Sequence, residues 1–319
     1  MIWRSPEPRY DVASGLSQGG RDYQEDAIVT DFPFGMDSGV AVLADGMGGH
    51  EAGDVASKIV ITQVFTELKF RSAQFAHTED QITDGFVSAA TNANKAIRDY
   101  VVANPRAAGM GATLVALVMV ENRMFWLSVG DSPLYVLRNG TLTQLNEDHS
   151  LAPQIDFMVE QGLISKRQAR EHPDRNCLTS VIMGRKIAKS DCPVAPFELQ
   201  MGDIVLLSSD GLQYLGEDML QKVLHRYRRR KSSEIAGHLL DAISELDDPD
   251  QDNVSFSVIK LNHMNPVTRK LAPKPLGHIP AAPDGSTRVV HLKPPVGSQN
   301  SDAETPASMF RTSRAAGGA

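Results

Sequence analysis

Cysteine is nearly absent from this 319-residue sequence, which contains only Cys177 and Cys192. Their spacing matches no metal site, and two cysteines are too few for a scaffold held together by disulfides. This pattern is typical of proteins in a reducing compartment. Long apolar runs are also missing. The longest, Ala112 to Val120, has about half of the ~20 residues that a membrane-spanning helix needs and predicts a buried strand. The first residues lack the apolar stretch of a signal peptide, and we therefore expect a cytoplasmic protein without a membrane anchor.

Basic residues are fewer than acidic ones. The chain has 32 Lys and Arg residues and 39 Asp and Glu residues, which gives a formal net charge of -7. From Asn262 onward there are seven basic and three acidic residues, so this segment carries +4 and the preceding part carries -11. A body this acidic excludes nucleic acid as a natural partner. It is compatible with a carboxylate-rich site that binds divalent cations.

The composition changes after Leu261, which sets the predicted boundary between a folded domain, residues 10–261, and a tail, residues 262–319. Eight of the 18 prolines lie in the tail, with Gly, Ser, Ala and Thr between them, and no helical or strand period is visible there. Such a composition is typical of disordered chain. The tail is either a passive extension or a docking and regulatory segment.

Hydrophobic periodicity in residues 10–261 predicts an α+β fold. The predicted helices cover residues 53–70, 81–102, 217–229 and 232–245. The predicted strands cover residues 40–44, 113–121, 123–129, 134–138, 203–208 and 254–261. Asn122 and the Asn139-Gly140 pair fall between strands, and Asn-Gly is a strong hairpin signal. Two helices, a run of hairpins, two more helices and a last strand favour central sheets with helices outside.

Acidic residues stand at the ends of apolar strands. Asp45 follows residues 40–44, Asp131 follows residues 125–130, and Asp210 follows residues 204–209, each with glycine adjacent. Asp252 comes just before the last predicted strand. The pair Glu25-Asp26, near the apolar Ile28-Val29, adds a further acidic position.

A carboxylate at a strand end is held rigidly by the sheet and still reaches water. Several that converge repel one another unless a cation neutralises them. Mg²⁺ and Mn²⁺ prefer such oxygen ligands, and neighbouring glycines let a carbonyl or an oxyanion come close. Any single acid has an alternative explanation as a turn former. Taken as a set, the repeated acid–glycine pattern predicts a divalent metal site.

Six short motifs follow one another over about 235 residues. They are Gly20-Arg-Asp-Tyr-Gln-Glu-Asp-Ala27, Ala44-Asp-Gly-Met-Gly-Gly-His50, Gly109-Met-Gly-Ala-Thr-Leu114, Gly130-Asp-Ser132, Ser209-Asp-Gly-Leu212 and Gln251-Asp-Asn-Val254. In this order they resemble the motifs of the metal-dependent type-2C (PPM) Ser/Thr protein phosphatases in their bacterial form. The resemblance implies a four-layer α-β-β-α sandwich, in which helices flank two central antiparallel sheets.

The resemblance also implies a two-metal centre that holds Mn²⁺ or Mg²⁺. Asp45 would bridge the two cations. Glu25 and the backbone carbonyl of Gly46 would help to hold one cation, and Asp210 and Asp252 would help to hold the other. Two cations roughly 3.5–4 Å apart activate a bridging water and neutralise phosphoryl oxygens, which suits the hydrolysis of phosphoserine and phosphothreonine in proteins.

Further residues take supporting roles in the resemblance. Asp131 would hold a possible third and weaker metal together with Asp210. Asp26 would support the metal ligands, and Thr113 and Asn253 would lie nearby as supports. Arg21 would hold the substrate phosphate, because its planar fork clamps two phosphate oxygens. From the residues alone, Arg21 has the alternative of an ordinary surface ion pair with Glu25 or Asp26.

Two positions depart from the family pattern. Met47 stands where eukaryotic members commonly have the histidine that is proposed as the general acid, so the proton donor for the leaving group is left open between His50 and a metal-bound water. Pro133 replaces the arginine that usually follows Gly-Asp-Ser, which removes a local ion pair at that hairpin.

Two segments lie outside these motifs. The cluster Arg226-Tyr-Arg-Arg-Arg-Lys231 is expected at a helix C-terminus, where cations suit the helix dipole; the alternative is a contact for an acidic partner or a phosphorylated substrate. The insert from Asp148 to Gly184 contains Phe157, Met158 and Leu163, and it forms either a mobile amphipathic flap or a short helix packed on the sheet edge.

The leading hypothesis is a protein-serine/threonine phosphatase whose partners are phosphoprotein substrates of Ser/Thr kinases, with no nucleic-acid or membrane partner. A second hypothesis is a non-catalytic phosphoprotein-binding module, which is expected to have lost metal ligands, whereas Asp45, Asp210 and Asp252 are all present. A third is a metal-dependent hydrolase of small phosphate esters.

Overall fold

A computed structural model describes residues 8–48, 51–75 and 80–262 of the chain. Its contacts divide the chain into two units, Met1–Thr268 and Arg269–Ala319, and every described helix and strand belongs to the first unit. The first strand begins at Tyr10 and the last ends at Leu261. His50 and residues 263–319 lie outside the described residues, so the predicted tail stays a prediction.

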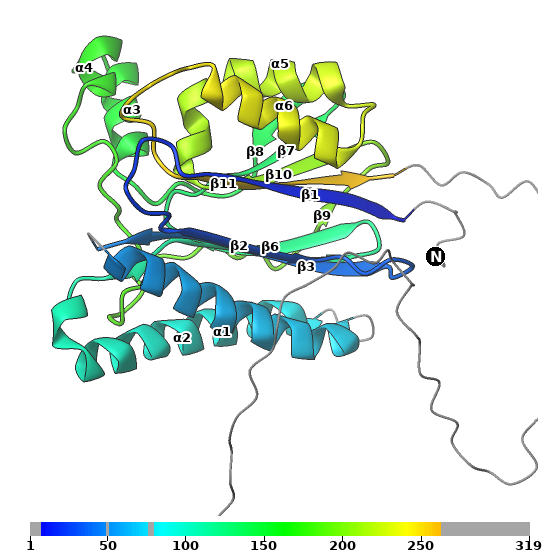
Figure 1. The fold of residues 1–319 in the computed structure, drawn as a ribbon, viewed down its shortest axis with the longest axis horizontal. Helices are drawn as coiled ribbons and strands as arrows, with labels where there is room; N and C mark the ends of the chain where they lie inside the picture. Colours follow the sequence, from blue (N-terminus) through cyan, green and yellow to red (C-terminus); the bar gives the residue numbers. More distant parts are fainter. Residues whose placement is uncertain (1–7, 49–50, 76–79, 263–319) are drawn as a thin grey trace, which may run out of the picture. The chain divides into compact units, whose positions relative to one another are not determined.

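In the described residues the strands pair into two antiparallel sheets (Figure 1). One sheet has the order β1-β11-β10-β7-β8; its strands are β1 (Tyr10–Ser17), β7 (Leu134–Arg138), β8 (Thr141–Gln144), β10 (Ile204–Ser208) and β11 (Val254–Leu261). The other has the order β2-β3-β5-β6-β9, with β4 paired to β3; its strands are β2 (Asp26–Asp31), β3 (Ser38–Met47), β4 (Gly111–Ala112), β5 (Leu114–Val120), β6 (Arg123–Val129) and β9 (Phe197–Glu198).

Helices cover the outer faces of both sheets (Figure 1). The helices α1 (Glu51–Phe75) and α2 (Asp80–Ala103) pack on the β3 sheet, whereas α5 (Glu217–Tyr227) and α6 (Ser232–Ser244) pack on the β11 sheet. Shorter helices lie in the connections: η1 (Pro105–Ala107), α3 (Ala152–Glu160), α4 (Lys166–Arg170) and η2 (Asp210–Leu215). This arrangement confirms the predicted α-β-β-α sandwich. Among the described helices, none has both the length and the apolar character to cross a bilayer.

Strand β5 is apolar throughout because it is covered on both faces. All seven of its residues are buried. One set of alternate residues packs toward α1 and α2: Leu114, Ala116, Val118 and Val120. The other set packs between the two sheets: Val115, Leu117 and Met119. Successive side chains of a strand point to opposite faces, so a strand covered on both faces is apolar throughout.

The expected turns and elements agree with the structure in most places. Asn139 and Gly140 join β7 to β8 with φ values of 53° and 89°, the left-handed conformation that favours this pair in a two-residue hairpin. The central strands begin and end within one residue of the predicted limits, except β3, which extends beyond residues 40–44 at both ends. Helix α1 extends beyond residues 53–70 at both ends, and α5 ends at Tyr227, two residues before the predicted end.

Candidate metal centre

Asp45 lies near the end of β3, directly opposite Asp26 of the neighbouring strand β2. Its backbone is held by Thr113, whose Oγ1 accepts the Asp45 N–H at 3.0 Å and whose own N–H donates to the Asp45 carbonyl at 2.8 Å. A 2.7 Å hydrogen bond between the hydroxyls of Thr113 and Ser132 fixes the threonine in turn. Thr113 therefore anchors the strand end that presents the Asp45 carboxyl.

Residues of the second sheet meet this strand end from the other side. Asp210 begins η2, two residues after the end of β10, and its charge acts on the Asp45 carboxyl and raises the pKa of that group. The Ser209 hydroxyl donates to Oδ2 of Asp26 at 2.7 Å, across 183 residues of sequence. Asp45, Asp26 and Asp210 are thus brought together where the two sheets share a rim.

Mutual repulsion and burial raise the pKa values of these carboxyls. Burial and then the charges of Asp26 and Asp210 raise the pKa of Asp45 well above its ordinary range. Burial and the charge of Asp210 raise the pKa of Asp26 to about 7 and that of Asp131 to about 7. Burial and the charge of Asp252 raise the pKa of Asp210 to about 6. The centre therefore favours any partner that adds positive charge.

Arg21 and Asp252 form an ion pair at the edge of this cluster. Nη2 of Arg21 lies 2.6 Å from Oδ2 of Asp252, and the arginine side chain is 54% exposed. Sequence reasoning left open a pair with Glu25 or Asp26, whereas the structure pairs Arg21 with Asp252. The guanidinium thus stands beside the carboxyls with its remaining donors open to solvent.

Asn253 holds the loop between β1 and β2, which carries Arg21 and Glu25. Its Oδ1 accepts the Glu25 N–H at 2.7 Å, and its Nδ2 donates to the carbonyls of Gln18 at 2.8 Å and Tyr23 at 2.9 Å. The Asn253 side chain is buried. One amide therefore fixes the loop at three points, one of which is the backbone of Glu25.

Glycines make room for the Glu25 carboxyl. Its Oε1 is buried and accepts no hydrogen bond of good geometry from the described residues. A Cβ placed at Gly53 of α1 would overlap this oxygen, and a Cβ at Gly46 would overlap the Gly53 carbonyl. Gly46 also donates its N–H to the Glu25 carbonyl at 3.2 Å. The close approach of β3, α1 and this loop at one point requires glycine.

These residues fit a divalent metal by two observations. The oxygen-only donor set is the kind that Mg²⁺ and Mn²⁺ prefer, and the buried Oε1 of Glu25 accepts no hydrogen bond of good geometry within the described ranges. In the part of the chain that the structure describes, no three His, Cys, Asp or Glu side chains already converge on one point as metal ligands do. The Asp252 carboxyl is instead paired with Arg21 at 2.6 Å.

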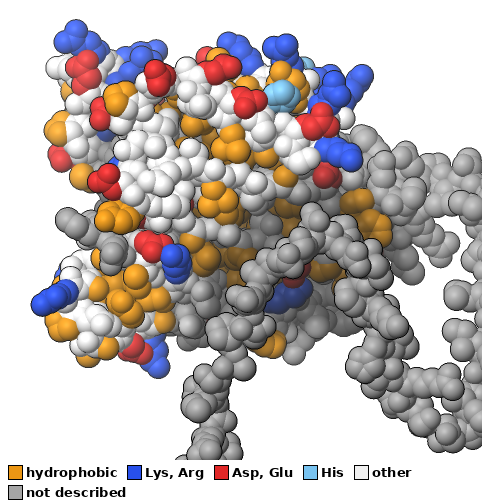
Figure 2. All heavy atoms as spheres, viewed as in Figure 1, with side chains coloured by type: hydrophobic (Ala, Val, Ile, Leu, Met, Phe, Trp, Pro, Cys, Tyr) orange, Lys and Arg blue, Asp and Glu red, His pale blue; other side chains and the backbone are white. Residues whose placement is uncertain are grey.

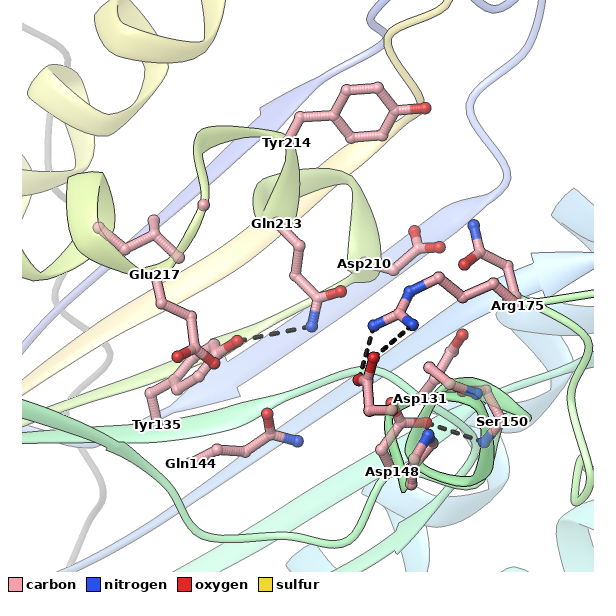
Figure 3. Close-up of a pocket in the computed structure, with 16 residues that line it drawn as sticks. Asp131, Tyr135, Gln144, Asp148, Ser150, Arg175, Asp210, Gln213, Tyr214 and Glu217 are labelled. Carbon is pink, nitrogen blue, oxygen red and sulfur yellow. Dashed lines mark hydrogen bonds and ion pairs between the residues drawn. The ribbon is translucent and has the colours of Figure 1, made fainter. Parts of the chain in front are cut away.

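A cavity of about 560 Å³ opens beside the cluster (Figure 3). Asp131, which follows β6, and Asp210 both line it. Arg175 points into this cavity and forms a two-pronged ion pair with Asp156, with both N–O distances 2.8 Å (Figure 3). The cavity is large enough for side chains that flank a phosphorylated residue.

The insert supplies one wall of this cavity through Asp148, Asp156 and Arg175. The insert contains the short helix α3, in which Ile155 is buried and Phe157 is 58% exposed, and the choice between a mobile flap and a helix packed on the sheet edge stays a prediction. His149, ahead of this helix, accepts the Gly130 N–H on its Nδ1 at 3.1 Å and so fixes the turn before Asp131.

Sequence reasoning missed Ser209, Gly53, Ser132 and His149. Ser209 is the first residue of a recognised motif, and His149 is the second residue of the insert, but neither was given a role. Their partners, Asp26 and Gly130, lie far away in the sequence. Sequence position alone therefore carried no signal for these hydrogen bonds.

The sandwich and the acidic rim together define a metal-dependent phosphatase of the α-β-β-α type. A family model described as Protein phosphatase 2C matches residues 22–243. The chain belongs to this family.

Similar proteins extend this result. The serine/threonine phosphatase stp of Listeria welshimeri is 34% identical over 225 residues, which cover 70% of this chain and 85% of the relative. The crystal structure of the Mycobacterium tuberculosis serine/threonine phosphatase PstP/Ppp is similar with a TM-score of 0.64 and 29% identity, covering 80% of this chain and 99% of that one. A structure of the PstP catalytic domain in complex with two manganese ions has a TM-score of 0.61 and 27% identity, covering 80% of this chain and 99% of that one.

Proposed function

We propose that this chain hydrolyses phosphoserine and phosphothreonine in proteins by a metal-activated water at a two-metal centre that holds Mn²⁺ or Mg²⁺. The observation that carries this proposal is the meeting of Asp45, Asp26 and Asp210 from two different sheets, with raised pKa values. The similarity to a phosphatase domain in complex with two manganese ions supports it.

We assign the metal ligands as follows. Asp45 would hold both cations, Glu25 and the carbonyl of Gly46 would help to hold one, and Asp210 and Asp252 would help to hold the other. The buried Oε1 of Glu25, which accepts no hydrogen bond of good geometry from the described residues, and the repulsion between the Asp45 and Asp210 charges support these roles. Asp131, whose pKa is raised by burial and by Asp210, is positioned to share a third, weaker metal with Asp210.

When bound, the two cations lower the pKa of a water to make the nucleophile and neutralise the charge on the phosphoryl oxygens. Arg21 binds the phosphate through the two parallel donors of its fork. The Arg21 side chain is half exposed and pairs with the Asp252 carboxylate at 2.6 Å. We infer that Arg21 leaves this carboxylate and binds the incoming phosphate instead.

The supporting residues keep the ligands in place. Asp26 accepts the Ser209 hydroxyl and ties the two sheets together beside Asp45. Thr113 fixes the backbone of Asp45. Asn253 fixes the backbone of Glu25. Such rigid support matters because catalysis by positioned charges loses efficiency with small displacements.

The partners are phosphoprotein substrates. We infer that Ser/Thr kinases phosphorylate them in the cytoplasm. The free cysteines Cys177 and Cys192 suit that reducing compartment. The net charge of -11 before residue 262 opposes binding to nucleic acid and to anionic membranes.

The test is hydrolysis of a phosphothreonine peptide and of p-nitrophenyl phosphate with Mn²⁺, comparing the wild type with Asp45→Asn. We expect turnover by the wild type, its loss with chelator, and near-complete loss in the variant. Asp99→Asn, on the exposed surface of α2, is the matched control and keeps full activity. Full activity of Asp45→Asn would refute the metal-site assignment.

Two further measurements separate the alternatives. A thermal shift on adding Mn²⁺, present in the wild type and reduced in Asp45→Asn, supports the metal site without relying on turnover. Unchanged thermal stability together with no turnover would favour the binding module. Faster turnover of free sugar phosphates than of the phosphothreonine peptide would favour a hydrolase of small phosphate esters.

A further inference from the structure

A cluster of exposed cations lies where α5 ends and α6 begins. We call the side chains of Arg226, Arg228, Arg229, Arg230 and Lys231 the basic patch; all five are exposed and fall within six consecutive residues. Figure 2 shows Lys and Arg side chains gathered at this corner of the described unit. The residues before 262 together carry a net charge of -11, so the basic patch is a local positive region on an otherwise acidic part of the chain.

The fold neutralises little of this charge. Arg226 lies 5.4 Å from the centre of the Tyr227 ring, and Arg228 donates to the His225 carbonyl at 2.6 Å. Arg230 is 3.7 Å from Glu234, in an exposed ion pair of small energy. The Arg229 and Lys231 side chains form no hydrogen bond or ion pair with any residue in the described ranges.

The helix dipole accounts for only part of the cluster. Cations are favourable in the last turn of a helix, and that effect fades beyond it. His225 and Arg226 lie in the last turn of α5, whereas Arg229 and Lys231 follow the end of the helix at Tyr227. The cations beyond the helix therefore need another explanation.

The basic patch borders a hollow of about 670 Å³, which Arg228, Arg229 and Lys260 line. The acid in its wall, Asp203, is 3% exposed and forms an ion pair with Arg138 at 2.6 Å, so it does not cancel the lining cations. A concave, positively charged wall suits a chain segment that carries carboxylates or phosphates, which pair with the forks of arginine.

The hollow lies at the opposite end of β11 from Asp252, because Lys260 and Leu261 at the end of this strand line it. Strand β11 begins next to Asp252 and ends at Leu261, which lines the hollow. Its eight residues, at about 3.3 Å each, separate the two sites by roughly 25 Å. One extended polypeptide of about eight residues or more can therefore reach both sites.

We propose that the basic patch and its hollow are a docking site for an acidic segment of the phosphoprotein substrate, bound while the phosphorylated residue occupies the carboxyl cluster. This proposal rests on the proposed function. The concave shape favours a peptide segment over a flat membrane surface. The chain's own sequence from residue 262 onward has a net charge of +4, which does not complement a positively charged patch.

The experiment compares four phosphothreonine peptides that differ only in a distal segment. Each carries a ten-residue Gly/Ser spacer and then four Glu or four Gln residues, placed either before or after the phosphothreonine. On the side of the phosphothreonine where the Glu segment reaches the patch, we expect kcat/KM of the Glu peptide to be at least tenfold higher than that of the Gln peptide. The gain is expected to come from a lower KM. In Arg228→Glu/Arg229→Glu this advantage disappears, while turnover of p-nitrophenyl phosphate is unchanged.

Controls separate docking from net charge and from folding. Lys95→Glu/Arg106→Glu changes the net charge by the same amount on exposed residues of α2 and η1, and it keeps the advantage of the Glu peptide. Arg228→Gln/Arg229→Gln, which removes charge without reversing it, loses part of the advantage. A melting temperature near that of the wild type shows that each variant folds.

Direct binding distinguishes failure of docking from failure of the proposed function. Fluorescence anisotropy of a labelled, Glu-rich 12-residue peptide without phosphate needs no turnover. Binding that weakens with salt and is lost in Arg228→Glu/Arg229→Glu supports the docking site. Equal kcat/KM for the Glu and Gln peptides, or patch-dependent binding to phosphatidylserine vesicles without binding to the peptide, would overturn it.

Discussion

Removing the Asn253 side chain tests whether the loop that carries Glu25 is held in place for metal binding. Asn253→Ala deletes three hydrogen bonds, which join Asn253 to Glu25, Gln18 and Tyr23 at 2.7, 2.8 and 2.9 Å. Each such bond contributes about 0.5–1.5 kcal/mol net. Gln18 and Tyr23 are exposed, so water can replace the partner of their carbonyls. We therefore expect a loss near the lower end of the sum, about 2 kcal/mol.

Two assays measure the consequences of Asn253→Ala. Urea unfolding in chelator gives the change in the free energy of unfolding, and Mn²⁺ titration of p-nitrophenyl phosphate turnover gives the metal concentration at half-maximal activity. We expect that concentration to rise at least tenfold, because Glu25 loses the bond that fixes its backbone. Such outer partners of metal ligands typically contribute about 10–100-fold in affinity or activity.

Asn94→Ala is the matched control for this prediction. The Asn94 amide donates to the Arg185 carbonyl at 2.6 Å and accepts the Gly184 N–H at 2.8 Å, away from the acidic residues. It is expected to cost stability without changing the Mn²⁺ requirement. If Asn253→Ala loses about 2 kcal/mol and keeps the wild-type Mn²⁺ requirement, Asn253 does not position a metal ligand.

Two further substitutions test local contacts. Gly53→Ala places a Cβ against Oε1 of Glu25, so we expect a higher Mn²⁺ requirement, whereas Gly237→Ala, in open space on α6, is expected to stabilise the helix by roughly 0.5–1 kcal/mol without that effect. His149 has a pKa lowered by burial and then by Lys189, and it must be neutral to accept the Gly130 N–H. Its stability contribution is therefore present above its unfolded pKa of about 6.5 and lost as pH falls below that value. Urea unfolding of the wild type and His149→Asn is expected to show this by a slope difference of up to about 1.4 kcal/mol per pH unit below pH 6.5, and identical slopes would contradict it.

Apart from the two-residue β4, the described strands that sequence reasoning did not predict are those at the edges of the sheets. β1 and β8 are the outer strands of one sheet, and β2 and β9 are the outer strands of the other. Their residues are mixed in exposure; β8, for example, alternates exposed and half-buried residues. Edge strands are covered on fewer sides, so they lack the apolar run that made β5 and β10 recognisable.

The acids of the candidate site were predictable because strand ends place polar groups at a rim. The contacts between them were not predictable in the same way. Ser209 reaches Asp26 across 183 residues, and Arg21 reaches Asp252 across 231 residues. These contacts depend on how two sheets stack, which the period of a single strand does not encode. The resemblance to a known family supplied that three-dimensional information instead.

The sandwich also fixes the geometry between the two sites that we assign to the substrate. β10 and β11 are paired antiparallel, so the end of one and the beginning of the other lie at the same rim. This pairing puts Asp210 and Asp252 together, and it puts Ile204 and Leu261 together at the far rim, beside the basic patch. Because paired and buried strands are stiff, the distance between the two sites stays fixed at roughly 25 Å. A substrate whose acidic segment lies closer than about eight residues to the phosphorylated residue cannot use both sites in an extended conformation, so shortening the ten-residue spacer to three is expected to abolish the advantage of the Glu peptide.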